Sequence, residues 1–281
     1  MAKLLEGKLV SAALKEKQQA QVAELKAKGI SPTLGIIRVG ERPDDISYEK
    51  GATKRCEGSG VEVKVFTLPE TAGQDELLAL IDQVNKDTSI HGVLLFRPLP
   101  KHMDDEVIRN ALVPAKDIDG ITDGSLSAVF TGKGKGFAPC TAQACIEILD
   151  FFGYELKGKR ATVIGRSLVV GKPVAIMLME RHATPTICHT RTVDMPAVCR
   201  GAEILIVAAG RAGVVGEDFF SPGQIVIDVG INFTEDGKMC GDADFDAAEK
   251  IVDAITPVPG GVGTVTTAVL VGNVIKAAAG S

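Results

Sequence analysis

The chain has 281 residues, of which 45% are hydrophobic and 24% are charged, and its formal net charge is -5. This length and composition are typical of a globular protein with one or two domains. No cluster of Lys and Arg stands out, so the composition disfavours nucleic acid and anionic membranes as partners, and an anionic ligand would need a local site.

The N-terminal stretch and the cysteines predict a cytoplasmic protein. The stretch MAKLLEGKLVSAALKEK is charged throughout and lacks a signal-peptide core, and we find no apolar run long enough to span a bilayer. The 6 cysteines lie far apart without a C-x-x-C motif, and the 4 histidines have no ligand spacing. We therefore expect reduced thiols and no metal centre.

Strand patterns and helix patterns alternate along the chain. Near-continuous apolar strands between helices are typical of a parallel sheet with helices on both faces. In the first half we predict helices over 9–28, 44–59 and 73–86 and strands over 33–39, 61–68 and 92–96. In the second half we predict strands over 160–165, 185–189, 204–209 and 224–230, helices over 171–181 and 194–201, and a Pro/Gly loop and apolar helix within 256–280. The two series join near 131–149, a Gly/Lys stretch that leads into a helix.

The stretch ATVIGRSLVVGKP, residues 161–173, combines the end of a buried strand with the start of a helix. Gly165 and Gly171 would span the turn between them, where backbone N–H groups and the helix dipole can bind a pyrophosphate. The spacing differs from G-x-G-x-x-G, so the turn is either a dinucleotide site or a plain connecting loop.

The end of the next predicted strand bears on the choice of cofactor. NAD sites often carry an acidic residue there, which binds the ribose 2′-hydroxyl. This strand instead ends in CHTRT, where Thr190 and Arg191 offer a hydroxyl and a guanidinium, with Arg166 in the preceding turn. These groups suit a 2′-phosphate and favour NADP over NAD. Asp194 comes slightly later and is equally well explained as a helix cap.

Seven segments occur in the order RVGERPDDISY, GVLLFRPLPKH, KDIDG, VIGRSLVVGKPVA, ICHTRT, IVIDVGIN and ITPVPGGVG. Together they resemble the methylenetetrahydrofolate dehydrogenase/methenyltetrahydrofolate cyclohydrolase family over essentially the whole chain. The resemblance implies an α/β fold of two α/β domains with a cleft between them, usually as a homodimer. A folate-binding catalytic domain would cover 1–139 and 260–281, and a Rossmann-like NAD(P)-binding domain would cover 140–259.

The resemblance also implies roles for individual residues. Tyr48 would border the folate and Asp119 would hydrogen-bond its pterin, and these two are the predicted catalytic residues. Without the resemblance, Tyr48 is more readily explained as a core tyrosine, and Asp119 as a turn residue before Gly120. The further predicted substrate ligands are Phe96, Arg97, Pro257, Gly260 and Gly261, and the predicted cofactor ligands are Gly165, Arg166, Ser167, Thr190, Arg191 and Ile231.

The chain departs from the family pattern at the folate site. The family's catalytic lysine lies four residues after the tyrosine, on the same helix face, and that position is Ala52 here. A glutamine is usual where this chain has Phe96, and an apolar residue is usual where it has Arg97. A His-Pro pair expected after the DG of KDIDG is absent. Lys50 and Lys54 flank Ala52 but would point well away from the face of Tyr48.

These departures affect one of the family's two reactions more than the other. Hydride transfer from methylenetetrahydrofolate needs positioning but no proton transfer, whereas hydrolysis of the methenyl product needs an acid/base group. We therefore predict a methylenetetrahydrofolate dehydrogenase with weak or absent cyclohydrolase activity. The alternatives are a bifunctional enzyme in which Lys50, Lys54 or Arg97 replaces the lysine, a non-catalytic folate or nucleotide binder, and a dehydrogenase for another small substrate.

Overall fold

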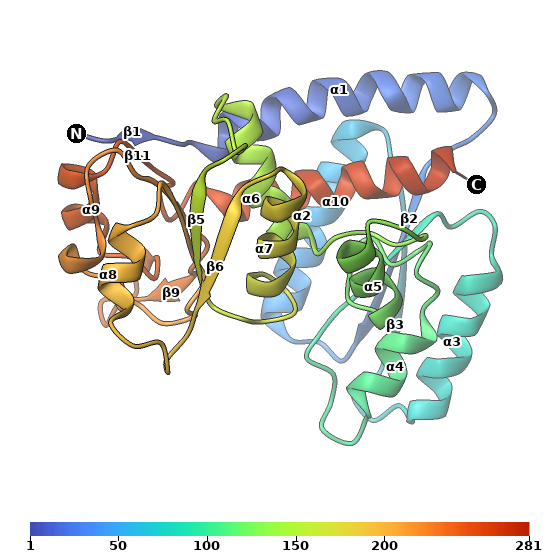
Figure 1. The fold of residues 1–281 in the computed structure, drawn as a ribbon. Coiled ribbons are helices and arrows are strands. Elements are labelled where there is room, and N and C mark those ends of the chain that lie inside the picture. Colours follow the sequence, from blue (N-terminus) through green and yellow to red (C-terminus); the bar gives the residue numbers. More distant parts are fainter. Residues whose placement is uncertain (281) are drawn as a thin grey trace. The chain divides into compact units, whose positions relative to one another are not determined.

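A computed structural model describes residues 1–280 and divides into two compact units, each built of alternating strands and helices (Figure 1). The first unit comprises Met1–Ala12 and Thr141–Thr266. The second comprises Ala13–Cys140 and the chain from Thr267 onward. The predicted α/β class with two α/β domains is confirmed.

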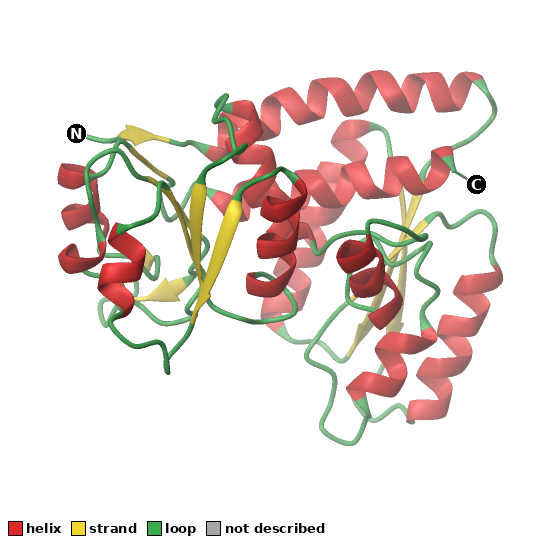
Figure 2. Cartoon of the chain, in the orientation of Figure 1, coloured by secondary structure: helices red, strands yellow, loops and turns green. Residues whose placement is uncertain are grey.

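The second unit is built on a three-stranded parallel sheet with the order β3-β2-β4. All residues of the central strand are buried, because helices cover both of its faces (Figure 2). A hydrophobic core packs Ile37 of the sheet against Leu77 and Ile81 of the helix α3. The elements of this unit are β2 (Thr33–Val39), α2 (Pro43–Ser59), β3 (Glu62–Leu68), α3 (Gln74–Lys86), β4 (Gly92–Leu95), α4 (Asp105–Ala111) and α5 (Asp123–Thr131).

The first unit is built on a six-stranded parallel sheet with the order β1-β11-β8-β7-β5-β6. The chain order reverses between β5 and β7, and in such sheets ligands bind beyond the carboxyl ends of the strands at this point. The elements are β1 (Lys3–Leu4), α6 (Cys140–Phe151), β5 (Arg160–Ile164), α7 (Gly171–Glu180), β6 (Thr184–Cys188), α8 (Met195–Arg200), β7 (Ile204–Val207), a 3₁₀ helix (Glu217–Phe219), β8 (Ile225–Asp228), β9 (Asn232–Phe233), β10 (Met239–Cys240), α9 (Phe245–Ile251) and β11 (Ala254–Ile255).

The predicted strands and helices all occur, with ends shifted by a few residues at most. The prediction missed short elements: β1 and β11 have 2 residues each, too few for a readable pattern. Strand β1 pairs with β11, so residues 3–4 belong to the six-stranded sheet, whereas the predicted domain ranges put them with the folate domain. The functional assignment of those ranges stays a prediction.

The two longest helices of the described chain lie near its two ends. Helix α1 (Gly7–Ala27) follows β1, and α10 (Val262–Ala279) is the last helix in chain order. By length and composition α10 could cross a membrane, so the expectation that no apolar run is long enough to span a bilayer was wrong, and 56% of the helix is buried inside the protein. Core helices of folded proteins meet the same two criteria.

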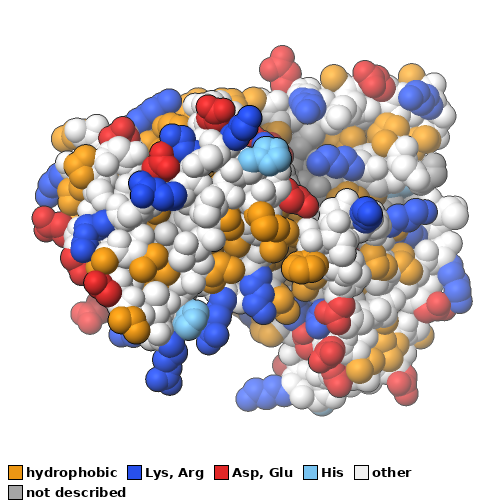
Figure 3. Space-filling model, viewed as in Figure 1, with side chains coloured by type: hydrophobic (Ala, Val, Ile, Leu, Met, Phe, Trp, Pro, Cys, Tyr) orange, Lys and Arg blue, Asp and Glu red, His pale blue; other side chains and the backbone are white. Residues whose placement is uncertain are grey.

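The charged side chains are mixed on the face drawn in Figure 3, where blue basic groups and red acidic groups alternate. This distribution agrees with a net charge of only -5. On this face, neither sign of charge forms one continuous field.

We expect Ile37→Ala to lower the free energy of unfolding by about 2–5 kcal/mol, because Ile37 is fully buried and its removal leaves a cavity in the sheet–helix core. Val65→Ala is the matched control, since Val65 lies on the edge strand β3 and is 43% exposed. Urea unfolding followed by circular dichroism would measure both. Equal stabilities of the two variants would contradict the packing described for β2.

Candidate functional site

The turn between β5 and α7 has the shape expected of a dinucleotide turn. Gly165 has a φ of 125°, and a side chain there would collide with the Ala208 carbonyl. A side chain at Gly171 would collide with the Gly165 carbonyl. The turn is therefore compact only with glycine at both positions. Ser167 closes it from within, since its Oγ accepts a hydrogen bond from the Val170 N–H at 3.1 Å.

Helix α7 begins in this turn without an acidic residue in its first turn and without a side-chain cap. Its N-terminal end thus keeps the positive end of the helix dipole available to an anion. Arg166 and Ser167 are both exposed beside it. These features favour the dinucleotide interpretation over a plain connecting loop.

Strand β6 brings the second group of predicted cofactor residues to the same sheet edge. It pairs with β5 in register, Ile164 opposite Cys188, so the residues after each strand are neighbours. The turn after β6 is tied by the His189 N–H, which donates to Thr192 Oγ1 at 2.9 Å, and by the Arg191 N–H, which donates to His189 Nδ1 at 3.1 Å. Thr190 and Arg191 are exposed there.

Asp194 is a helix cap. Its carboxylate accepts a hydrogen bond from the Ala197 N–H at the start of α8, at 3.4 Å. The cap interpretation is therefore confirmed, and the exposed cations Arg166 and Arg191 are the charged groups left at the ends of β5 and β6.

The loop after β11 and the loop after β8 also meet. A side chain at Gly261 would collide with the Pro257 carbonyl, and Gly260 has a φ of 105°. The Gly260 carbonyl accepts a hydrogen bond from the Gly7 N–H at 2.8 Å, which anchors the loop to the start of α1. The Ile231 side chain lies beside Gly263 and is 60% exposed, so it forms part of this edge.

The other predicted residues lie in the second unit, where Tyr48, Phe96 and Asp119 form one cluster. The rings of Tyr48 and Phe96 meet edge to face with 5.8 Å between their centroids. Burial of its hydroxyl raises the pKa of Tyr48 well above its usual range, and the Asp119 carboxylate nearby raises it further. Tyr48 is therefore neutral at physiological pH, although 41% of the residue is exposed.

Asp119 is the group in this cluster that titrates near neutral pH. Burial raises its pKa from 3.8 to about 6, and the neighbouring Asp117 carboxylate adds to the rise, while a hydrogen bond from Cys140 and the charge of Arg97 oppose it. The carboxyl of this half-buried residue therefore titrates closer to neutral pH than an exposed aspartate does.

The two aspartates of KDIDG have different roles. Asp117 is fully buried and accepts hydrogen bonds from the N–H groups of Ile121 at 3.0 Å and Thr122 at 2.8 Å, so it holds the turn. Gly120 has a φ of 67° and no room for a side chain. Because Asp117 closes the turn, Asp119 is left to face Tyr48 and Cys140.

Three further residues belong to this cluster and were not predicted from the sequence, namely Cys140, Thr267 and Asn273. The Cys140 thiol donates to the Ile118 carbonyl at 3.2 Å, and Asn273 donates to the same carbonyl at 2.9 Å. Thr267 hydrogen-bonds Tyr48. They come from distant parts of the chain, and no local pattern links them to KDIDG.

The two positions where the resemblance leads us to expect a lysine and a glutamine are apolar and enclosed. Ala52 lies one helical turn after Tyr48 on α2 and is 1% exposed, and Phe96 is 9% exposed. Lys50 and Lys54 are exposed on α2. The cluster thus presents a methyl group and an aromatic ring at the two positions where the resemblance leads us to expect an amine and an amide.

Arg97 is committed to an ion pair. Its guanidinium donates twice to the Asp105 carboxylate, with Nε 2.6 Å from Oδ1 and a second, shorter contact from Nη2. The pair raises the pKa of Arg97 and lowers that of Asp105. Bidentate pairing holds the side chain in one direction. Arg97 is thereby fixed beside Asp105, and its predicted contact with the substrate stays a prediction.

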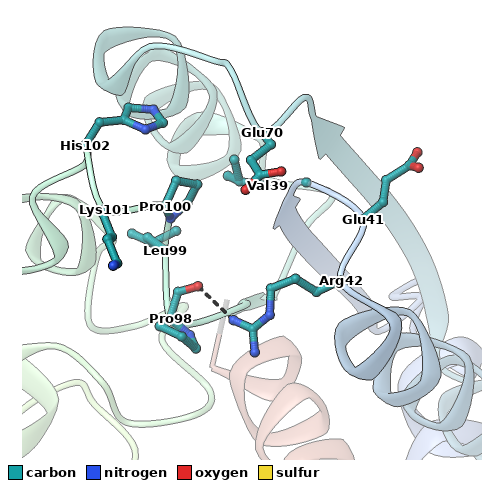
Figure 4. Close-up of a pocket in the computed structure, with 10 residues that line it drawn as sticks. Val39, Glu41, Arg42, Glu70, Pro98, Leu99, Pro100, Lys101 and His102 are labelled. Atoms are coloured by element: carbon teal, nitrogen blue, oxygen red, sulfur yellow. Dashed lines mark hydrogen bonds between the residues drawn. The ribbon is translucent and has the colours of Figure 1, made fainter.

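A cavity of about 560 Å³ lies beside the segment that follows Arg97 (Figure 4). Arg42 spans it, donating from Nη1 to the Pro98 carbonyl at 3.2 Å, so the loop after β2 is tied to the loop after β4. Glu41 points away from the cavity. Its lining includes none of the predicted site residues and consists of Val39, Gly40, Glu41, Arg42, Glu70, Pro98, Leu99, Pro100, Lys101 and His102.

Two domain descriptions match this chain. Residues 139–281 match the family model "Tetrahydrofolate dehydrogenase/cyclohydrolase, NAD(P)-binding domain", and residues 5–119 match the corresponding catalytic domain. The "Bifunctional protein FolD" of Carboxydothermus hydrogenoformans is 53% identical over 279 residues, which are 99% of this chain and 97% of that protein.

Solved structures agree with the sequence matches. The crystal structure of the bifunctional enzyme FolD from Campylobacter jejuni has a TM-score of 0.96 and 41% identity, covering 100% of this chain and 99% of that one. The Trypanosoma brucei methylenetetrahydrofolate dehydrogenase-cyclohydrolase, complexed with NADP and an inhibitor, has a TM-score of 0.91 and 31% identity, covering 99% and 97%.

We expect Asp119→Asn to gain stability relative to the wild type as pH rises from about 4 to 7. The folded protein binds the Asp119 proton more tightly than the unfolded chain, so the wild-type free energy of unfolding falls as the carboxyl ionises, and asparagine has no such loss. Urea unfolding at several pH values would measure the difference.

Asp105→Asn is the matched control with the opposite sign. Arg97 lowers the pKa of Asp105, so its stabilising contribution is present above the unfolded pKa and is lost as pH falls. A pH-independent difference between Asp119→Asn and the wild type would contradict the raised pKa.

Proposed function

The chain belongs to the tetrahydrofolate dehydrogenase/cyclohydrolase family, and on that premise we propose that it oxidises 5,10-methylenetetrahydrofolate to the 5,10-methenyl form with NADP and hydrolyses the product weakly or not at all. The observation that carries the second part is the enclosed pair of Ala52 and Phe96 beside Tyr48. Neither side chain can accept or donate a proton.

The residues at the ends of β5 and β6 fit the cofactor. The glycine turn leaves space for a pyrophosphate at the start of α7, and the exposed Arg166 and Arg191 suit the 2′-phosphate of NADP. The structure of the Trypanosoma brucei relative contains NADP, which supports the same choice. Bound NADP would accept the hydride that leaves the methylene carbon.

Hydride transfer requires little acid/base catalysis by this protein. The nitrogen lone pair next to the methylene carbon stabilises the cation that forms, so protein groups act mainly by holding the reactants. We propose that the exposed ring face of Tyr48 borders the folate and that the Asp119 carboxylate accepts hydrogen bonds from its pterin. Phe96 would keep the Tyr48 ring in place through their edge-to-face contact.

Hydrolysis requires more acid/base catalysis, because a proton must leave the attacking water and a C–N bond must open. General acid–base help is worth roughly 10²–10⁴-fold. Of the cations proposed as substitutes for the lysine, Arg97 is paired with Asp105, and Lys50 and Lys54 are exposed on α2 away from the Tyr48 face.

A bifunctional enzyme is the second candidate, and two observations favour it. Relatives that are 53% and 49% identical are named bifunctional. In addition, Asp119 has a pKa of about 6, so its carboxylate is available as a base at neutral pH. In this alternative Asp119 would take the proton that the family's lysine otherwise handles.

We expect the wild-type protein, given methylenetetrahydrofolate and NADP, to accumulate methenyltetrahydrofolate as NADPH appears. A spectrophotometric assay that follows both species would measure this. NADPH formation without accumulation of the methenyl species would favour the bifunctional enzyme. If neither the reduced cofactor nor the methenyl species appears, with NADP or with NAD, the dehydrogenase proposal is contradicted.

We expect the double variant Ala52→Lys with Phe96→Gln to gain methenyltetrahydrofolate hydrolysis by roughly 10²–10⁴-fold, because it restores an amine and an amide to the face of Tyr48. Hydrolysis by purified protein, corrected for the buffer rate, is the measurement. Lys54→Ala is the control and should hydrolyse as the wild type does. A wild-type rate already equal to that of the double variant would count against the proposal.

The homodimer implied by the resemblance and the cytoplasmic location predicted from the N-terminal stretch and the cysteines stay predictions. The edge strand β3 offers one surface for association, since it lies at the end of its sheet and exposes Val65. Sedimentation equilibrium and cell fractionation would check the two expectations.

A further inference from the structure

Two buried aspartates connect the loops at the carboxyl edge of the six-stranded sheet. Asp228 is the last residue of β8 and is 3% exposed, and Asp242 follows β10 and is fully buried. Neither was singled out by the sequence analysis, and the proposed chemistry uses neither. Buried carboxylates are costly unless they are hydrogen-bonded, so their partners define what they do.

Asp242 joins the loop after β7 to the loop after β8. Its Oδ2 accepts from the Gly210 N–H at 2.8 Å, and its Oδ1 accepts from the Arg211 N–H at 2.9 Å. Oδ1 also accepts from Asn232 Nδ2 at 2.9 Å. One carboxylate therefore sets the distance between residues 210–211 and the segment that contains Ile231.

Asp228 holds Asp242 in turn. Its carboxylate accepts from the N–H groups of Gly230 at 2.9 Å, Asp242 at 3.1 Å and Ala243 at 2.9 Å. Its own N–H donates to Thr256 Oγ1 at 2.8 Å. Thr256 directly follows β11, so this bond links the end of β8 to the end of β11. The ends of β7, β8 and β11 thus share one hydrogen-bonded network.

Glycines make room for this network. A side chain at Gly230 would overlap Asp242, and a side chain at Gly241 would overlap the Asp228 carboxylate. The sequences VGI and CGD therefore permit two carboxylates to approach the backbone closely. The packing leaves Ile231, 60% exposed, as the side chain presented at the edge.

We propose that Asp242 is a positioning residue for the cofactor, holding the loops after β7 and β8 so that Ile231 contacts the bound dinucleotide. The proposal rests on the proposed function, because it assumes that NADP binds at this edge. Asp242 does not touch the reacting atoms. It acts through the backbone of Gly210 and Arg211 and through Asn232.

Asp242→Asn tests this role. Asparagine keeps one acceptor oxygen, now uncharged, and replaces the other with a donor, so either the Gly210 or the Arg211 N–H loses its acceptor. We expect NADPH to bind about tenfold more weakly and the KM for NADP to rise similarly, while the KM for the folate changes little. NADPH fluorescence titration and steady-state kinetics would measure the split.

Asp253→Asn is the matched control. The Asp253 carboxylate accepts from the Gly223 N–H at 3.0 Å and thus also ties a loop to the same sheet, immediately before β11 begins, at its amino end. It should bind NADPH as the wild type does. Urea unfolding of both variants would separate a general loss of stability from a loss of positioning.

Asn232→Ala is a second, milder test in case Asp242→Asn does not fold. It removes one of the contacts to Asp242, and NADPH binding should weaken by a smaller factor than in Asp242→Asn. In the double variant, the loss of NADPH affinity should be smaller than the product of the two single losses. Unchanged NADPH affinity in Asp242→Asn or in Asn232→Ala would overturn the positioning role and leave the proposed function standing. A wild-type protein that binds no NADPH would overturn both.

Discussion

Parallel strands that are buried on both faces are the constraint on which both units depend. In β2 and β7 all residues are buried, so the strands themselves have no surface left for chemistry. Parallel pairing brings the carboxyl ends of neighbouring strands to one edge. Several of the residues proposed to bind a ligand therefore lie within a few residues after a strand: Gly165 after β5, Thr190 after β6, Ile231 after β8 and Phe96 after β4.

The loops at these edges are held mainly by carboxylates that accept backbone N–H groups. Asp117 closes the KDIDG turn in this way, and Asp228 and Asp242 do the same for the six-stranded sheet. Such bonds are charge-assisted and exclude water, so a loop without regular structure can still be well defined. The cost is burial of charge. It is visible in Asp228, because burial raises the pKa of its carboxyl to about 6.

Most of the fold follows from local patterns, and most of the polar networks do not. The apolar runs of β2 and β5 predict strands because burial requires them there, and Gly165 predicts a turn because its backbone conformation requires glycine. The family resemblance supplied Tyr48, Asp119 and Ile231. Asp242 and Asn273 were missed because their partners are 32 and 155 residues away in the chain, and single-sequence periodicity carries no information on such pairs.

The groups around Tyr48 differ in how readily they change charge, because most of them are enclosed. With an apolar ring against it and an enclosed hydroxyl, Tyr48 has a raised pKa and stays neutral. Cys140 is fully buried and its pKa is raised well above its usual range, so the thiol also keeps its proton. Asp119 is then the one member of the Tyr48, Phe96, Cys140 and Asp119 cluster that changes charge near neutral pH. Any proton transfer at this cluster must pass through that carboxyl, the same group proposed to bind the pterin, and a carboxylate engaged by the pterin is a poor base for water.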